Sequence, residues 1–394
     1  MFSKTIMEKM RANLKTYTMI LAVILIWVIF GALTQGIFFS PRNLSNLFRQ
    51  MTIVSFLAMG MVLVIVTGNI DLSVGSVTGF VSAVVAYLQF YTLPAILPEM
   101  SITARGIIVT TISILVGLGV GLLVGLFQGP LVAYLAIPAF IVTLGGMRIF
   151  RGGVLGVTLG STIVVSEKSF IAIAQGYVPN TVGWILGIIV IGLIFLGTFW
   201  NRTQRARYGF KPLPLYLDIL KAGSFSALVL TFVFIMNTYR GIPIPVLLMA
   251  VVAVFFTYLT NNTKFGRHAY ALGGNKEATR LSGINIKANI FWVMLLMGLL
   301  CAVAGIVLTG YVAAGTIGGG QDYELTAIAS CVIGGTSLMG GEGTIIGALV
   351  GSLIMASLLN GMSVMNMQPF WQYIIQGLVL IVAVYIDIAI KKKS

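Results

Sequence analysis

Twelve long apolar runs are the feature that most limits what this chain can fold into. Each run is near the ~20 residues that an α-helix needs to cross a bilayer. Backbone polar groups in lipid must be satisfied within the protein, which favours helices. The sequence therefore predicts an all-α membrane protein, a single polytopic helical bundle over residues 1–394. The runs lie at roughly 17–39, 51–68, 72–92, 102–128, 138–158, 181–200, 222–238, 243–261, 288–311, 325–340, 344–366 and 370–389.

The number of spans is predicted as about 12, within the range 10–12. The run at 325–340 is short and interrupted by glycines, so it is a candidate for a re-entrant segment. The first run follows a basic tail and lacks the short apolar region and cleavage site of a signal peptide. We therefore expect this run to be retained as the first helix.

Composition supports the membrane class and narrows the partners. Hydrophobic residues make up 58% of the chain and charged residues only 9%, whereas a soluble domain carries about 25% charge. The net charge of +14 could suggest nucleic acid, but the basic residues cluster in short loops, as orientation signals do. We therefore expect lipid contact and no nucleic-acid partner. Two cysteines in apolar context, Cys301 and Cys331, indicate neither a disulfide framework nor a metal site.

The distribution of charge predicts the orientation. With the N-terminus in the cytoplasm, the inside segments hold 17 of the 24 Lys and Arg residues. This excess predicts that both termini are cytoplasmic. Arg42 and Arg49 fall on the other side, where an interfacial amphipathic helix beginning near Pro41 would accommodate them.

Asp71 is the only charged residue between Arg49 and Glu99. A carboxylate at the centre of a lipid-facing helix costs ~2.5–3.5 kcal/mol, so this one must be shielded by protein or water. Glycine and serine on both sides indicate a broken helix. Asp71 could contact a ligand or cap a half-helix over 72–86 by accepting backbone N–H groups; we favour the cap.

A similar arrangement recurs in the second half of the chain, with Glu324 in the place of Asp71. Each half has an acidic residue, a short helix and a glycine-rich helix. The predicted spans place Asp71 near the inside and Glu324 near the outside. This is a weak inverted repeat, a plan that transporters often use. The glycine-rich helices carry Gly117, Gly121, Gly125 and Gly129 in one half and Gly343, Gly347, Gly351 and Gly361 in the other.

Sequence signals for catalysis are absent. The sequence contains no Gly-x-x-x-x-Gly-Lys-Ser/Thr phosphate loop and no Gly-x-Ser-x-Gly nucleophile elbow. The only histidine, His268, has no partner pattern for metal binding or acid–base work. We therefore expect no enzyme activity, no metal and no cofactor in this chain.

The polar loop 262–287 is the most specific segment. Its middle is predicted as a two-turn helix with Asn275 as the N-cap. Glu277 in the first turn and Arg280 near the last match the helix dipole, and Gly283 suits the left-handed position after the helix. A plain connection could be much shorter, so a capped amphipathic helix suggests a docking element. The alternative is a basic anchoring loop.

Three separated blocks, in order, resemble the permease subunits of ribose/xylose-type ABC sugar importers. The extra hydrophobic hairpin at about 181–238 and the aromatic residues at 370–373 resemble the longer, xylose-type branch. The resemblance covers nearly the whole chain. The blocks are 70–76 (IDLSVGS), 270–275 with 278–284 (YALGGN and ATRLSGI), and 324–329 with 332–338 (ELTAIA and VIGGTSL).

The resemblance implies a type II ABC importer-like permease that forms the pathway for a monosaccharide, with D-xylose as the first choice. It implies a second permease copy in a homodimer, a separate ATPase subunit that uses ATP and Mg²⁺, and an extracytoplasmic sugar-binding protein. It also implies the bacterial inner membrane as location. The alternatives are a secondary carrier working alone and a membrane scaffold or channel. The loop 262–287 argues for the ABC permease over both alternatives.

The resemblance also assigns residues to two sets. Similar sequences often have Gly, Ala or Glu at the position of Asn69, so no fixed chemical role is expected there. The coupling set is Gly273, Gly274, Asn275, Glu277, Arg280, Leu281 and Gly283, and the broken-helix or pathway set is Asn69, Asp71, Ser73, Gly75, Ser76 and Glu324.

Overall fold

A computed structural model describes residues 14–96, 102–210 and 214–391. The basic tails used to predict the orientation of the termini lie mostly outside these residues. The described part is helical, with one two-stranded antiparallel pairing of β1 and β2. The helices and strands are α2 (Leu14–Leu33), η1 (Ile37–Phe39), α3 (Pro41–Val66), α4 (Val74–Tyr87), η2 (Leu88–Thr92), α5 (Leu93–Ile96), α6 (Ile102–Ala133), α7 (Ala139–Thr158), β1 (Ile163–Val164), α8 (Lys168–Gln175), α9 (Asn180–Arg207), α10 (Leu215–Tyr239), α11 (Ile244–Asn262), α12 (Lys264–Gly274), α13 (Lys276–Leu281), α14 (Ile286–Val312), β2 (Ala314–Gly315), α15 (Tyr323–Ile333), α16 (Ile345–Val364) and α17 (Pro369–Lys391).

Every predicted apolar run contains a helix. Nine helices in the described residues are long and apolar enough to cross a membrane, and three shorter apolar helices accompany them. One of the three, α15, has 11 residues and is only about 16 Å long at 1.5 Å per residue. It is too short to cross the ~30 Å hydrocarbon core, as expected for the run at 325–340. The polytopic all-α prediction is confirmed.

The predicted helix start near Pro41 is confirmed, but the helix that carries Arg42 and Arg49 is not a separate interfacial helix. Ser40 caps a helix that starts at Pro41 and continues without a break to Val66. Its first turns therefore carry both arginines, and Arg49 lies over the rings of Tyr177 and Tyr311 at 5.6 and 5.7 Å. Contacts with the two aromatic rings accommodate the charge of Arg49. The sequence had instead suggested a helix at the membrane surface.

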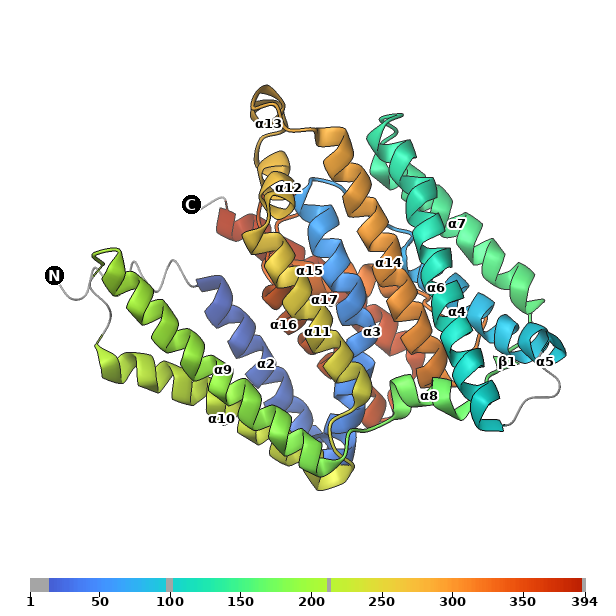
Figure 1. Ribbon diagram of the computed structural model, residues 1–394, viewed down its shortest axis with the longest axis horizontal. Helices are drawn as coiled ribbons and strands as arrows, with labels where there is room; N and C mark the ends of the chain where they lie inside the picture. Colours follow the sequence, from blue (N-terminus) through green and yellow to red (C-terminus); the bar gives the residue numbers. More distant parts are fainter. Residues whose placement is uncertain (1–13, 97–101, 211–213, 392–394) are drawn as a thin grey trace.

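Helices α3 and α14 form the centre of the molecule (Figure 1). The most apolar window of α3 is 89% buried, so protein rather than lipid surrounds it. Glycines allow α6 to lie directly on α14: a Cβ added at Gly121 would overlap the Gly298 carbonyl. The same holds in the second half, where a Cβ at Gly351 would overlap the Ser330 carbonyl of α15. Both glycine-rich helices are thus close-packing helices, as small residues in membrane helices predict.

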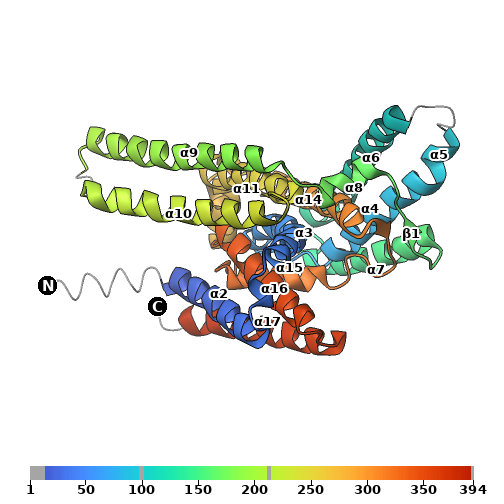
Figure 2. The same ribbon diagram turned by 90° about the horizontal axis from the view of Figure 1, so that it is seen from below.

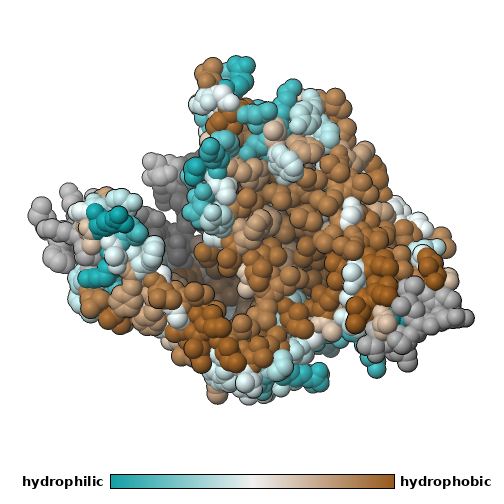
Figure 3. Space-filling view, viewed as in Figure 1, coloured by the Kyte–Doolittle hydropathy of each residue, from teal (hydrophilic) through white to brown (hydrophobic). Residues whose placement is uncertain are grey.

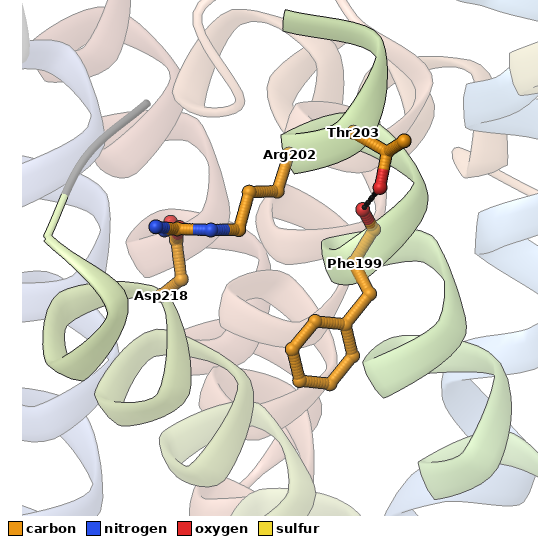
Figure 4. A network of polar contacts seen from close by, with 4 residues as sticks. All are labelled: Phe199, Arg202, Thr203 and Asp218. Carbon is orange, nitrogen blue, oxygen red and sulfur yellow. Dashed lines mark hydrogen bonds and ion pairs between the residues drawn. The ribbon is translucent and has the colours of Figure 1, made fainter. Parts of the chain in front are cut away.

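The extra hairpin consists of α9 and α10, which extend away from the rest of the bundle (Figure 2). At its free end Arg202 and Asp218 form an ion pair of 2.7 Å, next to a helical turn in which Thr203 donates to the Phe199 carbonyl (Figure 4). At its other end, Asn180 and Asn237 join the helices through hydrogen bonds to each other's backbone carbonyls. The hairpin is therefore fastened at both ends.

The surface separates into an apolar belt and polar ends. Hydrophobic side chains cover the sides of the helices, and hydrophilic residues gather around α12 and α13 and at the opposite edge (Figure 3). A belt between two polar ends fits a bilayer, because only the ends meet water. The polar loop 262–287, which contains α12 and α13, thus lies at one polar end.

Candidate functional site

Asp71 lies in the non-helical segment between α3 and α4. The predicted helix over 72–86 begins later, at Val74, with Ser73 as the residue before it. Asp71 Oδ1 accepts the Ser73 N–H at 2.8 Å and the Ser73 hydroxyl at 2.7 Å. Asp71 therefore fixes the residue that precedes the helix, instead of accepting an N–H from the helix itself. It is 3% exposed, and its accepted hydrogen bonds offset part of the cost of burial.

Side chains from two other helices hold the same segment. Gln128 of α6 donates from Nε2 to the Ser73 hydroxyl at 3.0 Å. Thr143 of α7 accepts the Leu72 N–H at 3.0 Å. The break before α4 is therefore a built junction of three helices. Ser76, in the first turn of α4, is also buried.

Glu324 lies on the first turn of α15 and packs against the first turn of α4. A Cβ added at Gly75 would overlap both the Glu324 carboxyl and the Gly320 carbonyl. The N-terminal ends of α4 and α15 therefore meet. The prediction that the two acidic residues lie toward opposite sides is wrong, because both short helices start at the same central place.

The two short helices run in opposite directions from this meeting point. The Gly341 N–H donates to the Val66 carbonyl at 2.9 Å, so the end of α3 and the segment after α15 share one end of the molecule. The chain therefore enters from that end before α4 and returns to it after α15. This opposite course agrees with the inverted arrangement expected from the sequence.

Asn69 belongs to a different place from Asp71. Its amide donates to the Thr67 hydroxyl at 3.0 Å. It lines a pocket of about 470 Å³ together with Lys276 and Arg280 of α13. The structure therefore separates Asn69 from Asp71, Ser73 and Ser76 and places it beside the docking helix.

Helix α13 has the predicted capping. The Asn275 side chain accepts the Ala278 N–H at 2.9 Å. Glu277 and Arg280 form an ion pair of 2.5 Å, and Gly283 adopts a left-handed φ of 76° after the helix. Leu281 is 78% exposed. The helix thus presents an apolar side chain and a charged pair to solvent, as a docking surface would.

Helix α12 connects α13 to the core. Gly273 lies so close to α3 that a Cβ would overlap the Val66 carbonyl, whereas Gly274 has open space around it. Tyr270 donates its hydroxyl to the Gly343 carbonyl at 2.8 Å. Burial raises the pKa of Tyr270, so its phenol stays protonated and keeps this bond. The docking element therefore rests on the end of α3 and on the segment between α15 and α16.

Sequence reasoning missed Gln128 and Thr143. It assigned no role to Tyr270, although this residue begins the motif at 270–275. Gln128 had a usable signal, because it is the only amide side chain in the long apolar helix α6, and polar residues inside membrane helices are usually functional. Thr143 had none, since threonine is common in membrane helices. In the described residues no group of three His, Cys, Asp or Glu could hold a metal ion.

The chain is similar in sequence to known membrane permeases. The chain is 42% identical over 385 residues to the xylose transport system permease protein XylH of Haemophilus influenzae, covering 97% of this chain and 98% of that protein. It is 41% identical to XylH of Escherichia coli K12, over 97% and 94% of the two chains. The ribose import permease RbsC of Escherichia coli K12 is 31% identical over 93% and 92%.

No solved structure matches the chain. The profile of the family described as "Branched-chain amino acid transport system / permease component" matches residues 43–213 and 217–384. These matches include α3 and the break before α4, the docking helix α13, and α15. The chain belongs to this family of membrane permease components and, within it, to the sugar permeases of ABC transporters.

Proposed function

We propose that this chain is the permease subunit of an ATP-driven importer of D-xylose or a related aldose in the bacterial inner membrane. The xylose permeases at 41–42% identity support the choice of sugar. One structural observation carries the mechanism. Helix α12 contacts both the end of α3, at Val66, and the segment after α15, at Gly343.

These two contact points lead directly to the two short helices. Val66 precedes the broken segment that holds Asp71 and starts α4, and Gly343 follows α15, which carries Glu324. A displacement of α13 by an ATPase subunit would therefore act on both short helices through α12. Because their N-terminal ends meet, such a movement would change the centre of the bundle. This is a rigid-element route of the kind that coupling between sites requires.

The exposed side of α13 supplies the surface for the ATPase. Asn275, Glu277, Arg280 and Leu281 stand on one short capped helix, with Gly273, Gly274 and Gly283 shaping its ends. The ATPase subunit uses ATP and Mg²⁺, and this chain has no ATPase site of its own. Because the ATPase subunit binds from the cytoplasm, we place α13 and both termini on the cytoplasmic side.

A neutral sugar suits the centre of this bundle. Asp71 is held by Ser73, so its role is to fix the break before α4 rather than to bind cargo. A sugar needs donors, acceptors and an apolar face, and no compensating charge. Two copies of the permease form the pathway, and an extracytoplasmic binding protein delivers the sugar and sets most of the specificity.

The test is uptake of radiolabelled D-xylose into proteoliposomes that contain the permease, its ATPase and its binding protein. Uptake should require ATP and all three proteins. Exchanging the charges of Glu277 and Arg280 should abolish co-purification of the ATPase and uptake, while the permease stays in the membrane. The matched control exchanges Arg202 and Asp218 of the hairpin, an ion pair far from α13, and should retain both. Uptake by the permease alone, without ATP, would overturn the proposal.

A further inference from the structure

A second polar pocket is lined by residues of η2, α6 and the chain between β1 and α8. In Figure 1 the elements β1, α5 and α8 of this region lie at the end of the molecule away from α13. The volume of the pocket is about 390 Å³, within the usual range of ~300–1,000 Å³ for small-molecule sites. Three segments meet there: the turn η2, the beginning of α6, and the chain between β1 and α8. Its wall includes Gln89, Phe90, Arg105, Ser166 and Glu167.

Gln89 is the least satisfied polar residue of this wall. It is 7% exposed, and neither its amide nitrogen nor its amide oxygen has a hydrogen-bond partner in the described structure. A buried amide without partners lowers the stability of the folded protein by roughly 1–3 kcal/mol. A ligand that hydrogen-bonds to Gln89 would offset this cost. Gln89 also lies in a π-helical turn, a conformation that is frequent at functional sites.

Glu167 is positioned by neighbouring groups. Its Oε1 accepts the Ser169 hydroxyl at 2.9 Å and the Ser169 N–H at 3.4 Å. The Ser169 hydroxyl in turn lies 2.7 Å from that of Thr110 and 3.0 Å from the Gly106 carbonyl on α6. A Cβ at Gly106 would lie 2.7 Å from the Glu167 carboxyl. The carboxylate is therefore held in the wall by Ser169 of α8, which is itself bonded to α6.

The charges of the wall select the ligand. The Glu167 carboxylate and the Arg105 guanidinium border the same pocket. Their opposite charges mean that the pocket favours neither an anionic nor a cationic ligand. A neutral molecule with several hydroxyls can donate to Glu167 and the Gln89 oxygen and accept from Arg105, Ser166 and the Gln89 nitrogen. The Phe90 ring adds an apolar surface. Phosphate headgroups of lipids fit poorly, because Glu167 would repel them.

We propose that this pocket is a binding site for a free monosaccharide at the extracytoplasmic end of the permease, separate from the centre formed by Asp71 and Glu324. The choice of sugar and of side rests on the proposed function. The site would hold sugar near the surface that meets the binding protein.

The test uses the full-length permease in lipid nanodiscs and measures D-xylose binding by saturation-transfer NMR. Gln89→Leu should weaken binding at least tenfold. It should leave the melting temperature unchanged or higher, because the amide has no protein partner to lose. Glu167→Gln should weaken binding several-fold while keeping the acceptor for Ser169. The control Gln372→Leu, remote from the pocket, loses a bond to the Met367 carbonyl and should leave binding unchanged.

Equal binding by Gln89→Leu and the unsubstituted protein would overturn the inference, as would an absence of binding to the unsubstituted protein. Binding that disappears when phosphatidylcholine is replaced by phosphatidylglycerol would assign the pocket to a lipid headgroup and also overturn it. ATP-driven uptake by the assembled transporter is measured separately. Uptake without binding here refutes this site alone, whereas no uptake of any aldose refutes the proposed function.

Discussion

The two acidic residues at the centre of the molecule are bound differently. Asp71 lies before α4, and one of its oxygens accepts two hydrogen bonds from Ser73. Glu324 lies on α15, and its Oε2 is buried without a partner in the described residues. Equivalent positions in the two halves of the chain therefore have unequal surroundings.

This difference indicates a division of roles. The Asp71 junction is fastened by α6 and α7 through Gln128 and Thr143. Glu324 instead depends on shape, because its carboxyl packs against Gly75, where a Cβ would overlap it. The segment before α4 is held by hydrogen bonds, whereas the start of α15 is held by close packing. The substitutions below separate these two ways of holding a short helix.

Asp71→Leu should have the largest effect. It leaves the Ser73 N–H without its acceptor and the Ser73 hydroxyl with only the longer bond to Gln128 Oε1 at 3.3 Å. A buried unsatisfied group costs about 1–3 kcal/mol. We expect little folded protein and no uptake, measured by size-exclusion chromatography and proteoliposome transport. Asp71→Asn keeps the acceptor and should retain most of both. Complete loss of uptake in a stably folded Asn variant would show that the charge itself is needed.

Gly75→Ala should come next, because its Cβ would collide with the Glu324 carboxyl and the Gly320 carbonyl. Overpacking of this kind costs about 1–3 kcal/mol. A lower melting temperature and slower uptake are the expected results. Gly119→Ala on α6 is the matched control, because its Cβ meets nothing within 4 Å. Equal melting temperatures for the two variants would contradict the close contact between α4 and α15.

Tyr270→Phe should have a smaller effect that is confined to one half. It removes the bond to the Gly343 carbonyl, worth about 0.5–1.5 kcal/mol. Sugar-stimulated ATP hydrolysis should fall several-fold while the ATPase still co-purifies, since α13 is unchanged. Tyr258→Phe, at an exposed ring on α11, should change nothing. Normal stimulation in Tyr270→Phe would argue against a route through the segment after α15.

Glu324→Gln should have the smallest effect on stability. The amide keeps the shape of the side chain and removes a charge that is buried with one oxygen unpartnered. The melting temperature should stay the same or rise slightly in a thermal-shift measurement. A fall as large as that of Asp71→Leu would show that the Glu324 carboxylate is held by bonds after all, and the contrast between the two halves would be lost.

The sequence predicted the local structure of the docking helix well and the centre of the bundle poorly. Capping by Asn275 and the left-handed turn at Gly283 depend on neighbours within a few residues, so they follow from spacing alone. The meeting of Gly75 with Glu324 joins residues about 250 positions apart, which span counting cannot foresee. The resemblance grouped Asn69 with Asp71, although Asn69 lines a pocket beside α13 and Asp71 does not.

The sequence by itself determined the membrane class, the helices and the capped helix α13, because hydropathy and caps act over short stretches. The resemblance carried by its motifs also determined the family. Tertiary structure decided how the charged residues are held. Asp71 is bound by Ser73, and Gln128 and Thr143 hold the same segment. Only packing could decide this, because the cost of a buried carboxylate depends on the donors that distant helices bring to it.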